Sequence, residues 1–179
     1  MKFNDLCDVI ARSSGIAFSE VQLYGRRLRE AGFLPQGSTG RSAPPIQAEH
    51  AANLLIGLMA TSVGRQAPEA MSRYREARRL LAEKLSDPEV AKTLIMIRLK
   101  RGTRSAMFWY WDMPEGQDPP AYESVRDRNF PYLSPELVTD VIERTTYDPF
   151  EVNVELRGDV IVRVAEALAA DAETDGRRR

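Results

Sequence analysis

The segment from Ile16 to Arg41 combines an arginine-rich helix with a basic loop, a combination suited to binding a polyanion. The helix contains three arginines, and Gly32 followed by Phe33-Leu34-Pro35 ends it. The next loop is rich in glycine and polar residues and contains a further arginine, Arg41. A short helix can place its outward face in a DNA major groove, while basic groups at its end and in the next loop contact phosphates. The segment therefore predicts DNA binding.

Patterns on either side of this segment predict the helices that position it. Residues 3–12 contain a helical stripe of apolar side chains that stops before Gly15, a residue that can supply a left-handed turn. Ser19 is expected to cap a helix that runs to Ala31. Residues 47–59 predict a third helix that completes the core beneath the first two. Its apolar face consists of Ala51, Leu54, Leu55, Leu58 and Met59.

This arrangement resembles the recognition helix and wing of winged helix-turn-helix proteins, in which a motif close to RRLREAGFL follows a small helical hairpin. The resemblance covers residues 1–60 and implies a three-helix DNA-binding domain. The positions that agree with it are Gly15, Val21, Leu28 and the step Gly32-Phe33-Leu34. The segment from Gly37 to Pro45 departs from it, because a usual wing is a β-hairpin and this segment runs quickly into a helix. The wing would then be only a basic loop.

Carried onto this chain, the resemblance implies two groups of DNA-contacting residues. Base reading falls to three exposed positions of the second helix, Ser19, Gln22 and Arg26. Glutamine can pair with adenine and arginine with guanine through two hydrogen bonds each, worth roughly 1–3 kcal/mol of discrimination per contact. Phosphate contacts fall to Arg27, Arg29 and Arg41. The alternative for the helix arginines is a solvated face that pairs with Glu30 or with acids elsewhere.

The charge distribution favours the same interpretation. Residues 1–112 contain 17 Lys and Arg against 11 Asp and Glu, whereas residues 113–179 contain 8 against 15. Double-stranded DNA would be attracted to the first part and repelled by the second, although a chance fluctuation of charge is the alternative. Four or five phosphate contacts would give only weak binding for one copy. Several copies are therefore expected to act together as a homo-oligomer.

The second half of the chain predicts an α+β arrangement. An amphipathic helix over residues 69–85 would connect it to the first half, with four arginines on its polar sides: Arg73, Arg75, Arg78 and Arg79. Residues 93–100 and 106–111 are rich in β-branched and aromatic residues around a turn signal, which predicts a β-hairpin. A helix starting at Ser134, a strand over 150–156 and a helix over 160–170 are expected to follow.

The predicted fold class is thus α+β, in four parts. Residues 1–63 would form the helix-turn-helix domain, 64–85 the connecting helix, 86–170 an α+β domain for assembly or a protein partner, and 171–179 a disordered tail. This order is similar to that of phage and prophage proteins, including small terminase subunits and compact phage regulators. That similarity implies transcription regulation or the initiation of DNA packaging.

The competing hypothesis is a scaffold or interaction module that does not bind DNA and contacts a protein through the aromatic hairpin. Strand alternation would place Phe108 and Tyr110 on one face and Trp109 and Trp111 on the other. A role in the sheet core or in a subunit contact is favoured over stacking on single-stranded bases.

Signs of other chemistry are few. His50 is expected to be a surface or capping group, and Cys7 a buried apolar thiol. The sequence contains no Cys/His pair, phosphate-binding glycine loop or metal-ligand cluster, so neither an enzyme nor a cofactor is expected. Asp112, Glu115 and Asp118 fit a solvated loop. The apolar run over residues 54–60 is too short to span a membrane and the N-terminus lacks a secretory signal pattern, so a cytoplasmic protein without membrane contact is expected.

Overall fold

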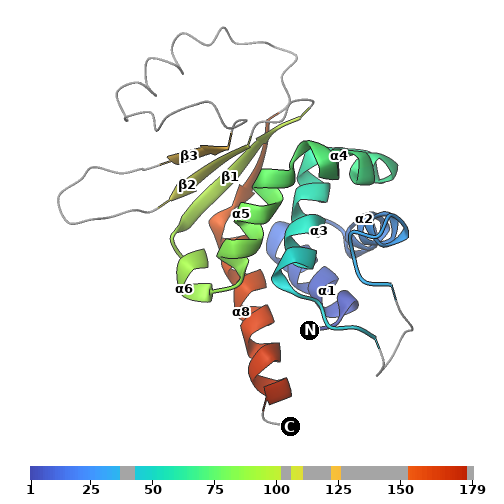
Figure 1. Cartoon of the computed structure of the whole chain (residues 1–179), viewed down its shortest axis with the longest axis vertical. Helices are drawn as coiled ribbons and strands as arrows, with labels where there is room; N and C mark the ends of the chain where they lie inside the picture. Colours follow the sequence, from blue (N-terminus) through green and yellow to red (C-terminus); the bar gives the residue numbers. More distant parts are fainter. Residues whose placement is uncertain (37–42, 102–105, 111–121, 126–152, 177–179) are drawn as a thin grey trace, which may run out of the picture.

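The computed structural model describes residues 1–36, 43–101, 106–110, 122–125 and 153–176. It is an α+β structure in which a group of N-terminal helices packs beside a four-stranded antiparallel sheet (Figure 1). A long C-terminal helix leaves the sheet and runs past the N-terminal helices (Figure 1).

Glycines end the two N-terminal helices where the sequence predicts. Helix α1 (Phe3–Ser14) ends at Gly15, whose φ of 76° lies in the left-handed region. Helix α2 (Phe18–Glu30) is followed by Gly32 at a φ of 81°. The backbone N–H groups of Gly32 and Phe33 donate to the carbonyls of Arg29 and Leu28 at 3.0 and 2.9 Å, which is the Schellman pattern for a helix end. Both predicted ends are confirmed.

The helix predicted over residues 69–85 is divided in two, which corrects the sequence-based expectation. A short 3-10 helix, η1 (Gly64–Gln66), leads into α4 (Ala67–Arg73), and α5 (Arg75–Leu85) follows. Tyr74 separates α4 from α5 with φ and ψ of −111° and 34°. Its hydroxyl donates to the carbonyl of Lys100 at 2.6 Å, which ties the break to the sheet. Helical periodicity could not reveal this break, because the hydrogen-bond partner of Tyr74 is 26 residues away in the sequence.

The sheet has the strand order β3-β2-β1-β4, and neighbouring strands are antiparallel throughout. The short helix α6 (Pro88–Ala91) precedes β1 (Leu94–Lys100), which pairs with β2 (Ala106–Tyr110). The edge strands are β3 (Tyr122–Val125) and β4 (Asn153–Arg157). The two segments predicted as a hairpin are therefore adjacent strands, and β4 falls in the segment predicted as a later strand. The sequence did not predict α6 or β3.

One face of the sheet packs into the core. Ile97 on β1 pairs with Phe108 on β2 and with Leu156 on β4, and all three side chains are buried. Phe108 therefore belongs to the sheet core, the role that the sequence favoured for this part of the aromatic segment. On the other face of the sheet, Arg98 forms an ion pair with Glu155 at 2.6 Å. Trp111 and the side chains of its two preceding neighbours lie outside the described residues.

Helix α3 (Ala48–Ala60) is the central helix, and it is buried almost all round. It packs against α2 and α4 on one side and against α5, β1 and β4 on others. Ala52 and Ile56 are buried together with Leu54 and Leu55 of the predicted apolar face. The single apolar face expected from the sequence is thus too narrow, because that expectation included only the first two helices as partners.

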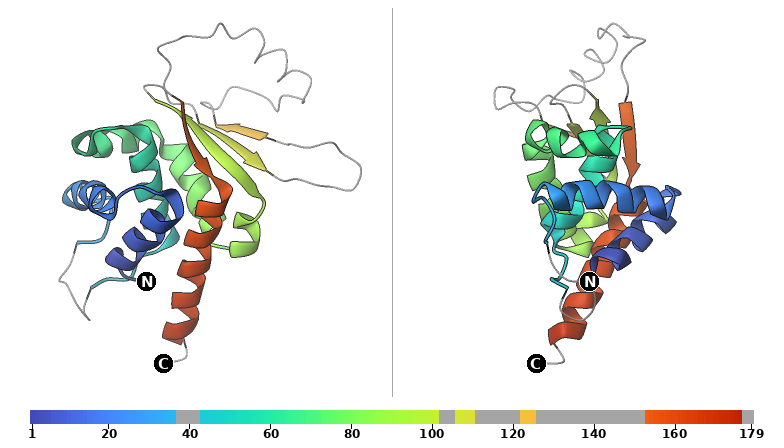
Figure 2. Two further views of the ribbon diagram at one scale, coloured as in Figure 1. Left: turned by 180° about the vertical axis from the view of Figure 1, so that it is seen from behind. Right: turned by 90° about the vertical axis from the view of Figure 1, so that its right-hand side faces the viewer.

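Helix α8 (Gly158–Gly176) joins the sheet to the N-terminal helices. Its residues Ile161, Val164 and Ala165 are buried, and it packs against α1, α5 and α6 (Figure 2). The hydrophobic core consequently continues across the domain boundaries predicted at residues 63 and 85. Residues 171–176, predicted as disordered, are helical, and Asp171 pairs with the amino group of Met1. That long-range pair gives the end of α8 a partner that its own sequence does not indicate.

Some predictions fall outside the described residues. These are the loop with Asp112, Glu115 and Asp118, the helix starting at Ser134, and Arg41 in the loop after α2. Among the helices that are described, none is both long enough and apolar enough to cross a lipid bilayer.

Candidate nucleic-acid interface

Helix α2 lies at the surface with one side against the core and the opposite side open (Figure 2, right). Val21, Tyr24 and Leu28 are buried on its inner side, where α2 packs against α1, α3 and α4. The opposite side, called here the α2 outer face, includes the exposed residues Ser19, Glu20, Leu23, Arg26, Arg27 and Glu30. The acidic C-terminal part of the chain, as far as it is described, packs elsewhere: α8 lies against α1, α5 and α6.

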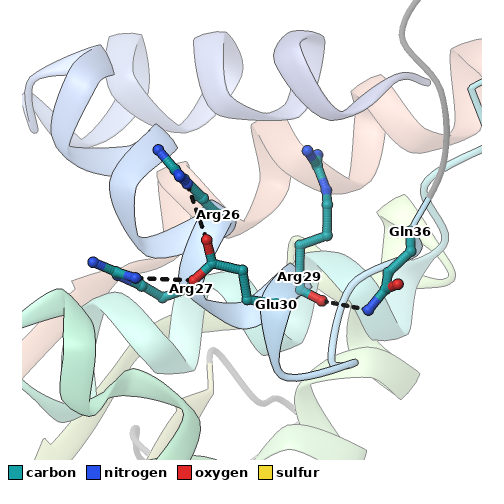
Figure 3. Close-up of polar contacts among 5 residues, drawn as sticks. All are labelled: Arg26, Arg27, Arg29, Glu30 and Gln36. Atoms are coloured by element: carbon teal, nitrogen blue, oxygen red, sulfur yellow. Dashed lines mark hydrogen bonds and ion pairs between the residues drawn. The ribbon is translucent and has the colours of Figure 1, made fainter.

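On the outer face, Glu30 bridges two arginines (Figure 3). Arg26 Nε donates to Glu30 Oε1 at 3.0 Å, and Arg27 Nη1 donates to Oε2 at 2.9 Å. The hydrogen bonds from Arg27 and Arg26 lower the pKa of the Glu30 carboxyl. The side chains of Arg26 and Arg27 are nevertheless 75% and 45% exposed. Because water screens exposed ion pairs, a phosphate or a guanine can compete with Glu30 for both guanidinium groups.

The other two candidate base-reading residues differ in accessibility. Ser19 is exposed in the first turn of α2, but Ala17 is the N-cap residue, so the predicted capping role of Ser19 is wrong. Gln22 is half-buried at the border of the outer face, and its Nε2 donates to Asn4 Oδ1 of α1 at 3.3 Å. One donor of the Gln22 amide is thus engaged by α1.

Arg29 extends away from Glu30 and from the outer face, toward α1 (Figure 3). Its guanidinium carbon lies 4.2 Å from the centre of the Phe3 ring, a cation–π arrangement. Phe3 packs onto α2 at Gly25, where an added Cβ would come within 2.2 Å of the ring. The missing side chain at Gly25 therefore permits the contact that holds Arg29. The structure thus separates Arg29 from Arg27, although the sequence grouped both with the phosphate contacts.

Hydrogen bonds fix the inner side and the C-terminal end of α2. The Tyr24 hydroxyl donates to the carbonyl of Thr61 at 2.8 Å, which joins α2 to the segment after α3. Burial raises the pKa of Tyr24, so this hydroxyl keeps its proton at neutral pH. Gln36 Nε2 donates to the carbonyl of Arg29 at 3.2 Å and fastens the segment after α2 to the helix end (Figure 3).

A buried asparagine anchors the turn after α2. Asn53 on α3 is 2% exposed, and its Nδ2 donates to the carbonyl of Phe33 at 2.8 Å. Its Oδ1 accepts a bond from Arg78 Nε at 2.6 Å, and Arg78 also donates to the carbonyl of Met71 at 2.8 Å. Burial lowers the pKa of Arg78. Arg78 is therefore a structural residue, and its prediction as one of the arginines on the polar sides of the helix is wrong.

The sequence did not single out two exposed residues beside the outer face, Val63 and Arg65. The 3-10 helix η1 packs against α2, and a Cβ added at Gly64 would lie 3.5 Å from Leu23 Cγ. Arg65, the next residue, is exposed and forms no ion pair within the described part of the chain. Its charge is visible in the sequence, but its closeness to α2 depends on how the segment after α3 folds back.

The two chemically distinctive residues outside α2 are structural. His50 Nδ1 accepts a bond from the backbone N–H of Gln47 at 3.1 Å at the start of α3, and burial lowers the His50 pKa. Cys7 is buried, which raises its pKa to about 12 and keeps the thiol protonated. The capping and buried-thiol predictions are confirmed. Within the described ranges, no group of three or more His, Cys, Asp or Glu residues is placed to hold a metal ion.

Comparison with known proteins identifies no relative. No protein-family model matches the chain, and no curated protein or solved structure matches it significantly. Any functional assignment therefore depends on the chemistry and geometry of α2 and its surroundings.

Proposed function

We propose that this chain binds double-stranded DNA by placing the α2 outer face in the major groove. The observation that carries the proposal is the 75% exposure of Arg26 on a helix whose other side is anchored in the core. A helix with its side chains is about 10–12 Å wide, and the major groove is about 12 Å wide. An anchored helix with an open, arginine-bearing face fits this groove without rearrangement of the core.

The residues of the interface have separate roles in this proposal. Arg26 donates two hydrogen bonds to O6 and N7 of a guanine, and Gln22 pairs with an adjacent adenine. Ser19 makes a further base contact from the first turn. Arg27 and Arg41 bind phosphates and set the position of the helix on the duplex. Arg29 has a positioning role, because its stack on Phe3 holds α1 against α2.

The helix-turn-helix unit of the proposal consists of α1, the turn at residues 15–17 and α2. In this proposal the basic segment after α2, which contains Arg41, takes the place of a wing. We infer that several copies act together, because the few cations of one outer face neutralise few phosphates. A regulator of transcription or a packaging-initiation protein of the small terminase type would use such an assembly, with the C-terminal half providing contacts between copies or to a protein partner.

Fluorescence anisotropy with labelled random-sequence duplex, measured over a salt series, tests the proposal. Affinity should fall with salt by about 0.9 log units per log unit of salt for each neutralised phosphate. Arg26→Ala should weaken binding and relax the base preference of duplexes selected from a random pool. The molecular mass of the protein in solution, measured in parallel, should exceed that of one chain.

A matched control is Arg79→Ala on α5. Arg79 is 68% exposed and pairs with Glu76 as Arg26 pairs with Glu30, but α5 packs against α3 and not along α2. Arg79→Ala should therefore leave DNA affinity unchanged. Absence of salt-sensitive binding by the folded protein, or an equal loss in both variants, would refute the proposal.

A further inference from the structure

Leu23 is an exposed apolar residue at the centre of the α2 outer face. Its relative exposure is 48%, and among the described residues only Phe18 and Val63 are comparably exposed large apolar side chains. Ser19 lies one turn before Leu23 on the helix, and Arg26 and Arg27 lie one turn after it. Leu23 is thus flanked by the Ser19 hydroxyl, the Glu20 carboxylate and two guanidinium groups on the face that would enter the groove.

The surroundings of Leu23 leave about half of its side chain uncovered. The neighbouring element, η1, meets Leu23 at Gly64, which has no side chain to cover it; an added Cβ there would be in van der Waals contact with Leu23 Cγ. Arg26 and Arg27, one turn further along the helix, are bonded to Glu30. A partner that covers Leu23 and also displaces Glu30 from the two arginines must offer an apolar group close to negative charge.

We propose that Leu23 contacts the 5-methyl group of a thymine in the major groove, beside the guanine bound by Arg26. This inference rests on the proposed DNA-binding function and adds the base that the outer face prefers. The thymine methyl is the apolar group that major-groove base edges present, and phosphates beside it supply the negative charge. Leu23 and Arg26 are three residues apart, about 4.5 Å along the helix axis. That separation is close to the spacing of about 3.4 Å between successive bases of a strand. The preferred sequence should therefore contain a thymine within two base pairs of a guanine.

The experiment begins with selection of preferred duplexes by the full-length chain from a random pool. Each thymine of the selected sequence is then replaced singly by deoxyuridine, which removes only the 5-methyl group, and affinity is measured by fluorescence anisotropy. One replacement should weaken binding by about fourfold, the effect of exposing one methyl-sized group. Leu23→Ala should bind more weakly overall and should respond equally to thymine and deoxyuridine at that position.

Val63→Ala is the matched control. Val63 is 40% exposed and precedes Gly64, but it lies outside α2, so its truncation should preserve the deoxyuridine effect. Leu23→Met, whose side chain has a similar volume, should also preserve the deoxyuridine effect. This variant provides the test if Leu23→Ala is less well folded. The inference is overturned if the selected duplex contains no thymine near a guanine, or if no replacement weakens the wild type. The inference is also overturned if Leu23→Ala loses as much affinity as the wild type when thymine is replaced by deoxyuridine. In each of these results the chain still binds DNA, whereas failure to bind any duplex overturns the proposed function as well.

Discussion

Glu30→Gln is expected to strengthen DNA binding, since Glu30 holds both outer-face arginines that would contact DNA. Its two carboxylate oxygens accept bonds from Arg26 and Arg27 at 3.0 and 2.9 Å. Those bonds lower the pKa of the Glu30 carboxyl, so it stays ionised at neutral pH and must be displaced by guanine or phosphate. Glutamine keeps the size of the side chain but removes the charge. Both guanidinium groups then become available without loss of helix packing, because Glu30 is exposed.

The magnitude follows from the exposure of the two pairs. An exposed ion pair shifts an equilibrium by no more than about fivefold, and water screens both pairs of Glu30. Releasing two such pairs, together with removing one negative charge near the DNA, should increase affinity by roughly three- to tenfold at low salt. The increase should shrink as salt rises, because mobile ions screen the same charges.

The assay is fluorescence anisotropy with a fixed duplex over a salt series. The matched control is Glu89→Gln on α6, where Glu89 is exposed and pairs with Lys92 at 2.6 Å. This control makes the same change in net charge away from α2. The reasoning is refuted if Glu30→Gln binds DNA no more tightly than the wild type. It is also refuted if Glu89→Gln gives an equal increase, because net charge alone would then explain the effect.

Three further predictions concern stability. Gly25→Ala should destabilise the chain by about 1 kcal/mol, because the added methyl group overpacks against Phe3. In a Phe3→Ala background the same substitution should stabilise the chain by up to about 1 kcal/mol, because alanine favours the helix over glycine. Urea titrations measure both effects, and equal effects in the two backgrounds would show that the Phe3–Gly25 contact is not responsible. Asn53→Ala should cost about 2 kcal/mol because it leaves two half-buried hydrogen-bond partners, the Phe33 carbonyl and Arg78 Nε, unsatisfied. Asn4→Ala, at an exposed position, should cost less than about 0.5 kcal/mol. Burial lowers the His50 pKa in the folded chain, so the unfolded chain protonates His50 at a higher pH. The stability of the fold should therefore decline as the pH falls below about 6.5. If this linkage is correct, the melting temperature of His50→Gln should depend less on pH than that of the wild type.

Local signals were sufficient for the C-terminal ends of the two helices at the candidate interface, but not for the start of α2, where Ala17 and not Ser19 is the N-cap. Gly15 and Gly32 end α1 and α2 as predicted, because a helix end in the left-handed conformation depends on one residue and its immediate neighbours. Val21 and Leu28, two of the positions that agree with the resemblance, are buried on the inner side of α2. The pairing of the helix arginines with Glu30, offered as an alternative from the sequence, is also a local contact within one helix turn.

Contacts between distant segments were not predictable in the same way. Arg78 and Arg79 are adjacent in the sequence, yet Arg78 binds buried Asn53, whereas Arg79 is exposed. The break at Tyr74 depends on a carbonyl of the sheet, and the small strand β3 has a four-residue sequence with little pattern of its own. Arg65 approaches α2 only because the segment after α3 folds back onto it.

The sequence by itself determined the α+β class, the arginine-bearing amphipathic helix and the residues at which it ends. Only the tertiary structure decided that α3 is buried on nearly all sides, that α8 continues the core to α1, and that Arg26 is open while Arg29 stacks on Phe3. The physical reason is that periodicity records which side of a helix is apolar. The number of sides that are covered, and the partner of each polar group, depend on elements far away in the sequence.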